Sequence, residues 1–304
     1  MKSFGGSLQQ RLDDAGELID AAVAAAEAEY PGAGLDLLVL PEFAIASGQG
    51  MLAHEQAVKL EGAVQAALGA KARQYHAYLV VPMIMDEGEQ YSNAAVLYDR
   101  SGNVAGIYRK VYPMADIDNV IEGGITPGAE YPVFDCDFGK LGMLICWDMA
   151  YDDGWEALAR KGAEVVALCS ASPQTVRPAS QALRRHYYVV SSTPRNNASI
   201  FNPMGLVDAQ ITDAGVLVRQ LDLSYAILHW SEKLHNGQAF TRRFGDRVGY
   251  CYSEREDTGI FWSNDTNISI GSMTRELGFR EMNAEIERVR QIDDAARGYQ
   301  RGQP

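Results

Sequence analysis

The chain has 304 residues, of which 47% are hydrophobic and 22% charged, and its formal net charge is −13. This composition excludes a disordered chain, a collagen and a small disulfide scaffold, and the length suits one large domain or two small ones. Phosphate binding needs a concentrated positive face, so the acidic balance argues against a nucleic-acid partner. No apolar run approaches the roughly 18 residues of a membrane span, so we expect no membrane partner.

The cysteines give no sign of a structural framework. They stand at positions 136, 146, 169 and 251, without CxxC pairing, and their spacing suggests neither disulfides nor a zinc site. No HExxH motif is present, and we predict no metal site. The first ten residues lack the apolar core of a secretory signal, so we expect a reducing, cytoplasmic location in which each thiol acts alone.

Helical and strand patterns alternate along the chain. We predict helices at 12–26, 58–75, 154–161, 178–186 and 282–289, strands at 35–40, 78–85, 141–145, 164–169 and 187–192, a hairpin of 93–98 with 104–108, and more sheet at 199–207 and 216–223. The alternation implies an α/β fold, and the added hairpins suggest a mixed sheet or two packed sheets. No linker rich in Pro, Gly or Ser divides the chain, and the amphipathic stretch near Ile286 suits docking on the body or on a second subunit.

Three apolar strands end at a reactive side chain. Glu42 follows LLVLP, Lys110 follows GIYR, and Cys146 follows GMLI. Each residue alone is more often an edge, surface or packing residue. Together, a thiol, a carboxylate and an ammonium can open an amide or nitrile: the thiolate attacks, the lysine favours the thiolate and holds the oxyanion, and the glutamate moves the proton. The backbone N–H of Trp147, just past the nucleophile, is a candidate second oxyanion donor.

In these three motifs, LVLPEF, YRKVYP and LICWD, the sequence resembles the nitrilase superfamily of carbon-nitrogen hydrolases. The resemblance implies that Glu42, Lys110 and Cys146 form a catalytic triad, and that Glu122 in EGGITPG is the second glutamate that positions the lysine and the attacking groups. It implies pocket or oxyanion positions for Phe43, Tyr112, Trp147 and Cys169. For Cys169, core packing is the other interpretation.

The resemblance also implies the architecture. We expect a four-layer α-β-β-α sandwich that lacks the usual first strand, because residues 1–10 are polar and glycine-rich. The hydrolase domain is expected at 1–270, followed by a C-terminal tail at 271–304 that lies at a subunit interface of a homodimer or higher homo-oligomer. The reaction implied is hydrolysis of a C–N bond through a thioester, without a cofactor.

Several functions stay open. The first is an amidase that converts a small linear amide to a carboxylic acid and ammonia, because Asp148, two residues after the nucleophile, resembles amidase-type members. A nitrilase and an N-carbamoyl amino acid amidohydrolase are the nearest alternatives, although Met149 and Ala150 offer no basic group for a substrate carboxylate. A Cys/His hydrolase is another possible chemistry, but it needs a histidine base, and no histidine of this sequence stands at a predicted strand end. The alternative from another class is a catalytically idle binding or assembly module.

Overall fold

The computed structural model describes residues 6–46, 52–172, 174–195, 197–211 and 215–298. The chain divides into two compact units, residues 1–220 and 221–304. The hydrolase domain was expected to run to residue 270, about fifty residues beyond this division. Because the compact units are defined by contacts within the chain, they do not test that boundary, which stays a prediction. Among the described residues, no helix is both long enough and apolar enough for a membrane span.

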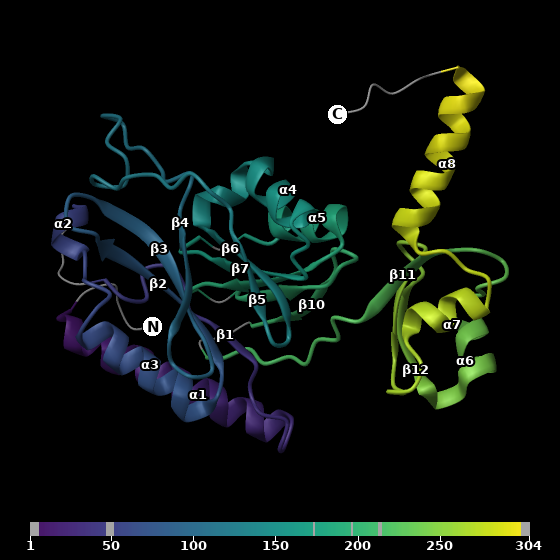
Figure 1. Cartoon of the computed structure of the whole chain (residues 1–304), viewed down its shortest axis with the longest axis horizontal. Coiled ribbons are helices and arrows are strands. Elements are labelled where there is room, and N and C mark those ends of the chain that lie inside the picture. The colour runs from purple at the N-terminus through teal and green to yellow at the C-terminus, as the bar shows by residue number, and fades with distance from the viewer. Residues whose placement is uncertain (1–5, 47–51, 173, 196, 212–214, 299–304) are drawn as a thin grey trace. The chain divides into compact units, whose positions relative to one another are not determined.

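The first unit contains two sheets and most of the helices (Figure 1). Its elements are α1 (Leu8–Glu29), β1 (Leu37–Val39), α2 (Ala53–Gln56), α3 (Ala63–Tyr75), β2 (Tyr78–Asp86), β3 (Tyr91–Tyr98), β4 (Val104–Arg109), β5 (Val133–Cys136), β6 (Gly139–Ile145), the 3-10 helix η1 (Cys146–Ala150), α4 (Asp152–Arg160), β7 (Val165–Cys169), α5 (Val176–Arg185), β8 (Tyr188–Ser192), β9 (Ser199–Phe201) and β10 (Val207–Gln210). One sheet has the order β1-β2-β3-β4 and the other β10-β9-β8-β7-β6-β5.

The two sheets are in contact, and helices flank them. Strand β3 contacts β6, and β1 contacts β8. The helices α1 and α3 contact each other and bury Leu12, Ile19 and Leu68 in one core with β2 and β3. On the other sheet, α4 and α5 contact each other and α5 contacts β8. This mixed α/β arrangement confirms the predicted fold class. The first element of the described residues is α1, and β1 follows it.

Strand direction decides which side chains meet. Strands β6, β7 and β8 are parallel, with Ile145 opposite Cys169 and Cys169 opposite Ser192. The residues that follow β6 and β7 therefore emerge at one edge of the sheet. In the other sheet, β1 is parallel to β2, whereas β2, β3 and β4 are antiparallel.

Some predicted boundaries were wrong. The helix expected from residue 58 begins at Ala63, because Val58 forms a bridge with Met85 beside β2. The sheet expected at 199–207 is two short strands, β9 and β10, and no strand forms at 216–223. The helix expected at 282–289 extends to Arg297.

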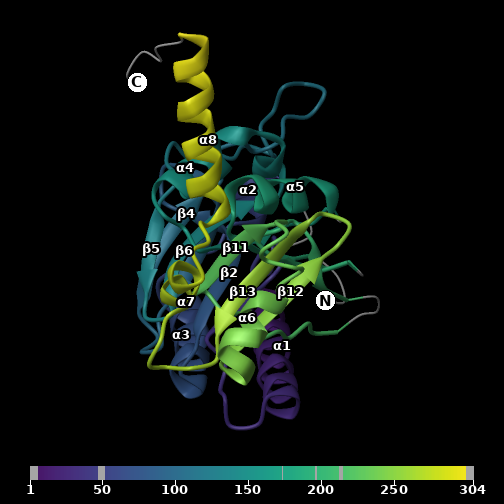
Figure 2. The ribbon, with the colours of Figure 1, turned by 90° about the vertical axis from the view of Figure 1, so that its right-hand side faces the viewer.

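The second unit is a small antiparallel sheet with helices (Figure 2). It consists of β11 (Tyr225–His229), α6 (Gln238–Phe244), the 3-10 helix η2 (Gly245–Arg247), β12 (Val248–Ser253), β13 (Thr258–Ser263), α7 (Ile270–Glu276) and α8 (Met282–Arg297). Its core contains Phe240, Phe261 and Met273. No residue of α8 is buried; its place at a subunit interface stays a prediction.

Candidate active site

Two of the side chains expected at strand ends, Glu42 and Lys110, meet in the first unit. Glu42 follows β1 and Lys110 follows β4 in one sheet, and Cys146 follows β6 in the other. The Nζ of Lys110 lies 3.0 Å from Oε1 of Glu42, and both side chains are 1% exposed. Lys110 also donates a hydrogen bond to Oε1 of Glu122, whose side chain is 15% exposed. The structure thus brings Glu42, Lys110 and Glu122 into one buried cluster.

Glu42 is fixed from both sheets. Its Oε1 accepts from Lys110 and from Nδ2 of Asn93 at 3.0 Å. Its Oε2 accepts the backbone N–H of Ala171 at 2.9 Å. Because β6 and β7 are parallel and adjacent, Ala171, just past β7, emerges at the same edge as Cys146. Because Ala171 binds Glu42, the Glu42 carboxylate lies at the edge where Cys146 emerges.

The surroundings of Cys146 favour the protonated thiol over the thiolate. Burial raises its pKa to about 11, the charge of Glu42 adds to the rise, and Lys110 and a hydrogen bond with Ser170 oppose it. The sequence predicted that a nearby lysine would favour the thiolate. Lys110 does act in this direction, because it lowers the thiol pKa, but burial and the Glu42 charge outweigh it. A thiol in this setting needs a base to become a nucleophile.

The alkylation of Cys146 is expected to show this pKa. Its rate with iodoacetamide should still rise between pH 8 and 10, whereas a free cysteine with a pKa of about 8.5 approaches a plateau. Glu42→Gln should move the profile to lower pH, because the Glu42 charge raises the thiol pKa. Peptide mapping of the alkylated protein at each pH gives the rate at this position. A plateau below pH 8 in the wild type would contradict the assignment.

Glu122, Cys146 and Phe43, the residue after Glu42, have backbone in the left-handed region. Phe43 has φ 59°, Glu122 has φ 36° and Cys146 has φ 45°. Non-glycine residues seldom adopt this conformation, and strain of this kind clusters at functional sites. At Cys146 the chain passes directly from β6 into η1, so the turn that holds the sulfur is sharp.

Asp148 connects the turn at Cys146 to the segment that contains Lys110. Its Oδ2 accepts from the Tyr108 hydroxyl at 2.6 Å and from the Ile145 N–H at 2.9 Å, and its Oδ1 accepts the Tyr112 N–H at 2.8 Å. Burial raises the pKa of Asp148, against the lowering effect of these hydrogen bonds. Since Tyr108 and Tyr112 flank Lys110 in the sequence, one buried carboxyl group fixes Cys146 and Lys110 relative to each other.

The predicted pocket residues lie in different surroundings. Phe43 packs against the small cluster that contains Ile84 and Ile125. The Tyr112 ring stacks on Tyr151 with 3.8 Å between centroids.

Trp147 and Cys169 also differ. The Trp147 ring lies 6.0 Å from the Arg177 guanidinium. Cys169 is completely buried, and burial together with the Glu42 charge holds its pKa well above the ordinary value. Pocket and oxyanion roles for these four residues stay predictions.

Sequence reasoning missed Asn93. This side chain, 1% exposed, donates from Nδ2 to Glu42 and also to Oε2 of Glu122, at 3.1 Å. A signal was available, because Asn93 is a polar amide within the predicted strand 93–98, which is otherwise apolar apart from Tyr98. A buried polar side chain is usually hydrogen-bonded, so an asparagine in an apolar strand indicates a specific partner.

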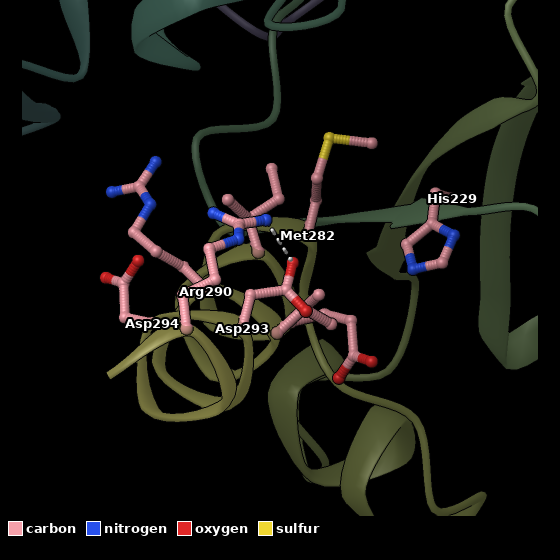
Figure 3. A pocket seen from close by; sticks show the side chains of 9 residues that line it. His229, Met282, Arg290, Asp293 and Asp294 are labelled. Atoms are coloured by element: carbon pink, nitrogen blue, oxygen red, sulfur yellow. Dashed lines mark ion pairs between the residues drawn. The ribbon is translucent and has the colours of Figure 1, made fainter. Parts of the chain in front are cut away.

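A groove in the second unit has a different character (Figure 3). It runs along α8 beside His229 of β11, and Met282, Ile286 and Val289 supply its apolar part. An ion pair of 3.5 Å joins Arg297 and Asp293. The lining contains neither cysteine nor lysine, so the groove lacks the chemistry of the buried cluster. Within the described part of the chain, no group of three or more His, Cys, Asp and Glu side chains is placed to hold a metal ion.

Solved structures share this fold. Nit3 of Saccharomyces cerevisiae, a member of branch 10 of the nitrilase superfamily, has a TM-score of 0.57 and 21% identity, covering 70% of this chain and 83% of its own. The amidase of Nesterenkonia AN1, solved as a mutant, gives a TM-score of 0.57 and 23% identity, covering 68% and 83%. At these identities the similarity shows the fold alone.

Sequence relatives point to the same group. The bifunctional nitrilase/nitrile hydratase NIT4 of Oryza sativa subsp. japonica is 32% identical over 142 residues, 46% of this chain and 39% of that protein. The omega-amidase NIT2 of Danio rerio is 26% identical over 225 residues, 65% of this chain and 80% of its own length. The match therefore spans about two fifths of the plant relative.

The family model settles the membership. The carbon-nitrogen hydrolase model matches residues 6–228, a region that contains Glu42, Lys110, Glu122 and Cys146. The chain therefore belongs to the carbon-nitrogen hydrolase family, within the nitrilase superfamily that its three motifs resemble.

Proposed function

We propose that the protein hydrolyses a small linear amide to a carboxylic acid and ammonia, through a thioester on Cys146. The observation that carries this proposal is the contact of the buried Glu42 carboxylate with Lys110, at 3.0 Å, at the edge where Cys146 emerges. A buried base next to a nucleophile is the arrangement that covalent acyl transfer needs.

The first half of the reaction forms the thioester. Glu42 takes the thiol proton as Sγ of Cys146 attacks the amide carbon, and the carbonyl oxygen becomes an oxyanion. Lys110 and the Trp147 N–H donate to this oxyanion. When the C–N bond breaks, the nitrogen takes the proton from Glu42 and leaves as ammonia. Glu42 is again a carboxylate, so protons and charge balance.

The second half releases the acid. Glu42 takes a proton from water, whose oxygen attacks the thioester carbon. The second tetrahedral intermediate collapses, the C–S bond breaks, and Sγ receives the proton back from Glu42. Lys110 stays charged throughout, because the charges of Glu42 and Glu122 raise its pKa against the opposing effect of burial. A lysine with this pKa acts as a fixed cation and does not serve as a base.

The relatives favour an amide over a nitrile. Similarity to a protein named omega-amidase extends over 65% of this chain, whereas similarity to the rice nitrilase/nitrile hydratase extends over 46%. The same thiol, base and cation can also add to a nitrile carbon, so nitrile hydrolysis is the second candidate function.

Ammonia release is the direct test. With a panel of primary amides, nitriles and ureido acids, we expect turnover of at least one short amide with kcat in the usual range of about 1–10³ s⁻¹. Nitriles and ureido acids should react at least about tenfold more slowly. Preferential turnover of a nitrile would replace the first candidate by the second. No ammonia from any member of the panel would contradict both.

A further inference from the structure

Asn93 occupies a place on β3 that the backbone fixes next to Lys110. Its carbonyl accepts the backbone N–H of Lys110 at 2.8 Å, which continues the pairing of β3 with β4 by one residue. The side chain is 1% exposed, and Ala94, Ala95 and Val96, which follow it, are fully buried. A polar amide is therefore held in the apolar interior, beside the charged cluster.

The Asn93 amide closes a ring of hydrogen bonds. Lys110 donates to Oε1 of Glu42 and Oε1 of Glu122. Nδ2 of Asn93 donates to Oε1 of Glu42 at 3.0 Å and to Oε2 of Glu122 at 3.1 Å. An amide nitrogen carries two hydrogens, one for each carboxylate. Each glutamate is thus bonded by both the lysine and the asparagine.

The chemistry of the partners fixes the orientation of the amide. Both neighbours of Nδ2 are carboxylate oxygens, which only accept, so the opposite orientation would place Oδ1 against two negative groups. Oδ1 itself is buried and has no donor among the described residues. The side chain of Asn93 therefore contacts the cluster through the two bonds that its nitrogen donates.

The charges of the cluster explain why those bonds matter. Two carboxyl groups, those of Glu42 and Glu122, share the single ammonium group of Lys110 in this buried site. Like carboxylates at close range oppose each other's ionisation. Donors to the charged forms favour ionisation, and Asn93 supplies one to each.

We propose that Asn93 is a positioning residue that holds Glu42 and Glu122 ionised in one arrangement, so that Glu42 faces the Cys146 thiol as a base. This inference rests on the proposed function, in which Glu42 moves the proton. Without the amide, each carboxylate would lose a donor to its charged form and the orientation that this donor fixes. Glu42 would then no longer be held in the arrangement that accepts the proton of the thiol.

Kinetics of Asn93→Leu test the proposal. We expect kcat to fall about 100-fold, the lower end of what a positioned base contributes, with KM changed less than about threefold. The acid limb of kcat/KM should move about one pH unit upward, because the carboxylates lose donors to their charged forms. Asn93→Asp, which adds a third carboxylate, should be less active near pH 8 and recover as the pH falls.

Asn202→Leu is the matched control. Asn202 is also a buried asparagine, 6% exposed, but its Oδ1 accepts from the nearby Met204 and Leu206 N–H groups. This variant should lose thermal stability to a degree similar to Asn93→Leu and keep the wild-type acid limb. A wild-type acid limb in Asn93→Leu, with activity reduced only in proportion to the folded fraction, would overturn the proposal.

Infrared titration separates this inference from the proposed function, because it needs no substrate. The band of the protonated carboxyl group should appear at higher pH in Asn93→Leu than in the wild type, and Glu42→Gln and Glu122→Gln assign it. If no amide is hydrolysed, the proposed function fails while this titration still decides the role of Asn93. Identical titrations in the wild type and Asn93→Leu would reject that role.

Discussion

Replacing Cys146 by alanine is expected to lower the rate of amide hydrolysis by roughly 10⁴- to 10⁶-fold, the range known for loss of a catalytic nucleophile. The methyl group cannot form the thioester, and Glu42 and Lys110 offer no other nucleophile. Substrate binding should persist, because the variant keeps the charged cluster. Ammonia release under single-turnover conditions, with enzyme in excess, measures the loss.

The control for this variant is Cys251→Ala. Cys251 is exposed and lies on β12 in the second unit, so its removal should leave hydrolysis unchanged. Mass spectrometry of wild-type enzyme quenched with acid during turnover should show the acyl group on Cys146 and none on Cys169. An adduct on Cys169, or activity that survives Cys146→Ala, would move the nucleophile elsewhere.

The strand ends of the site were predictable from the sequence because apolar runs stop abruptly. Pro41 cannot donate to a sheet ladder, so β1 had to end before Glu42. Buried strands read as continuous apolar runs, which marked β6 and thereby Cys146. The direction of β6 and β7 then follows from the helix α4 between them, since a parallel pair needs such a crossover.

Two strands of the second unit, β12 and β13, escaped prediction for a physical reason. Gly249 and Gly259 interrupt β12 and β13, and glycine weakens strand patterns. In the structure, a Cβ at Gly249 would lie 2.3 Å from the Trp262 ring, and one at Gly259 would lie 2.7 Å from Tyr252. The glycines make room for aromatic rings on the paired strand, a requirement that only the register reveals.

The electrostatics of the site also lay beyond the sequence. The sequence supplied a lysine and a thiol, and from these only the direction of the lysine's effect on the thiol pKa could be predicted. The sign of the thiol pKa shift depends on burial and on the Glu42 charge, which exceed the effect of Lys110. Neither is visible without the packing of one sheet against the other. The same packing gives Glu42 its Ala171 donor, 129 residues away in the chain.

Lys110→Met is the second change with a large expected effect, because it removes the only cation bonded to Glu42 and Glu122 among the described residues. Breaking a buried ion pair from one side costs about 3–5 kcal/mol of unfolding free energy. Loss of the oxyanion donor should lower kcat by a further factor of about 10²–10³ in the fraction that stays folded. Denaturant unfolding and ammonia release measure the two effects separately.

The pH dependence of this stability loss has a defined sign. Since the pKa of Lys110 is raised on folding, its stabilising effect is full below its ordinary pKa of about 10.4 and is lost only as the pH rises beyond that value. The stability difference between the wild type and Lys110→Met should therefore stay nearly constant between pH 5 and 8 and shrink above about pH 10.4.

A lysine in an exposed ion pair provides the comparison. Lys71 pairs with Asp20 at 2.5 Å, but the two side chains are 25% and 45% exposed, so Lys71→Met should cost less than about 1 kcal/mol. If Lys110→Met cost no more unfolding free energy than Lys71→Met, the contacts of Lys110 with Glu42 and Glu122 would not stabilise the buried cluster. The acid-base assignment of Glu42 would then lose its physical basis.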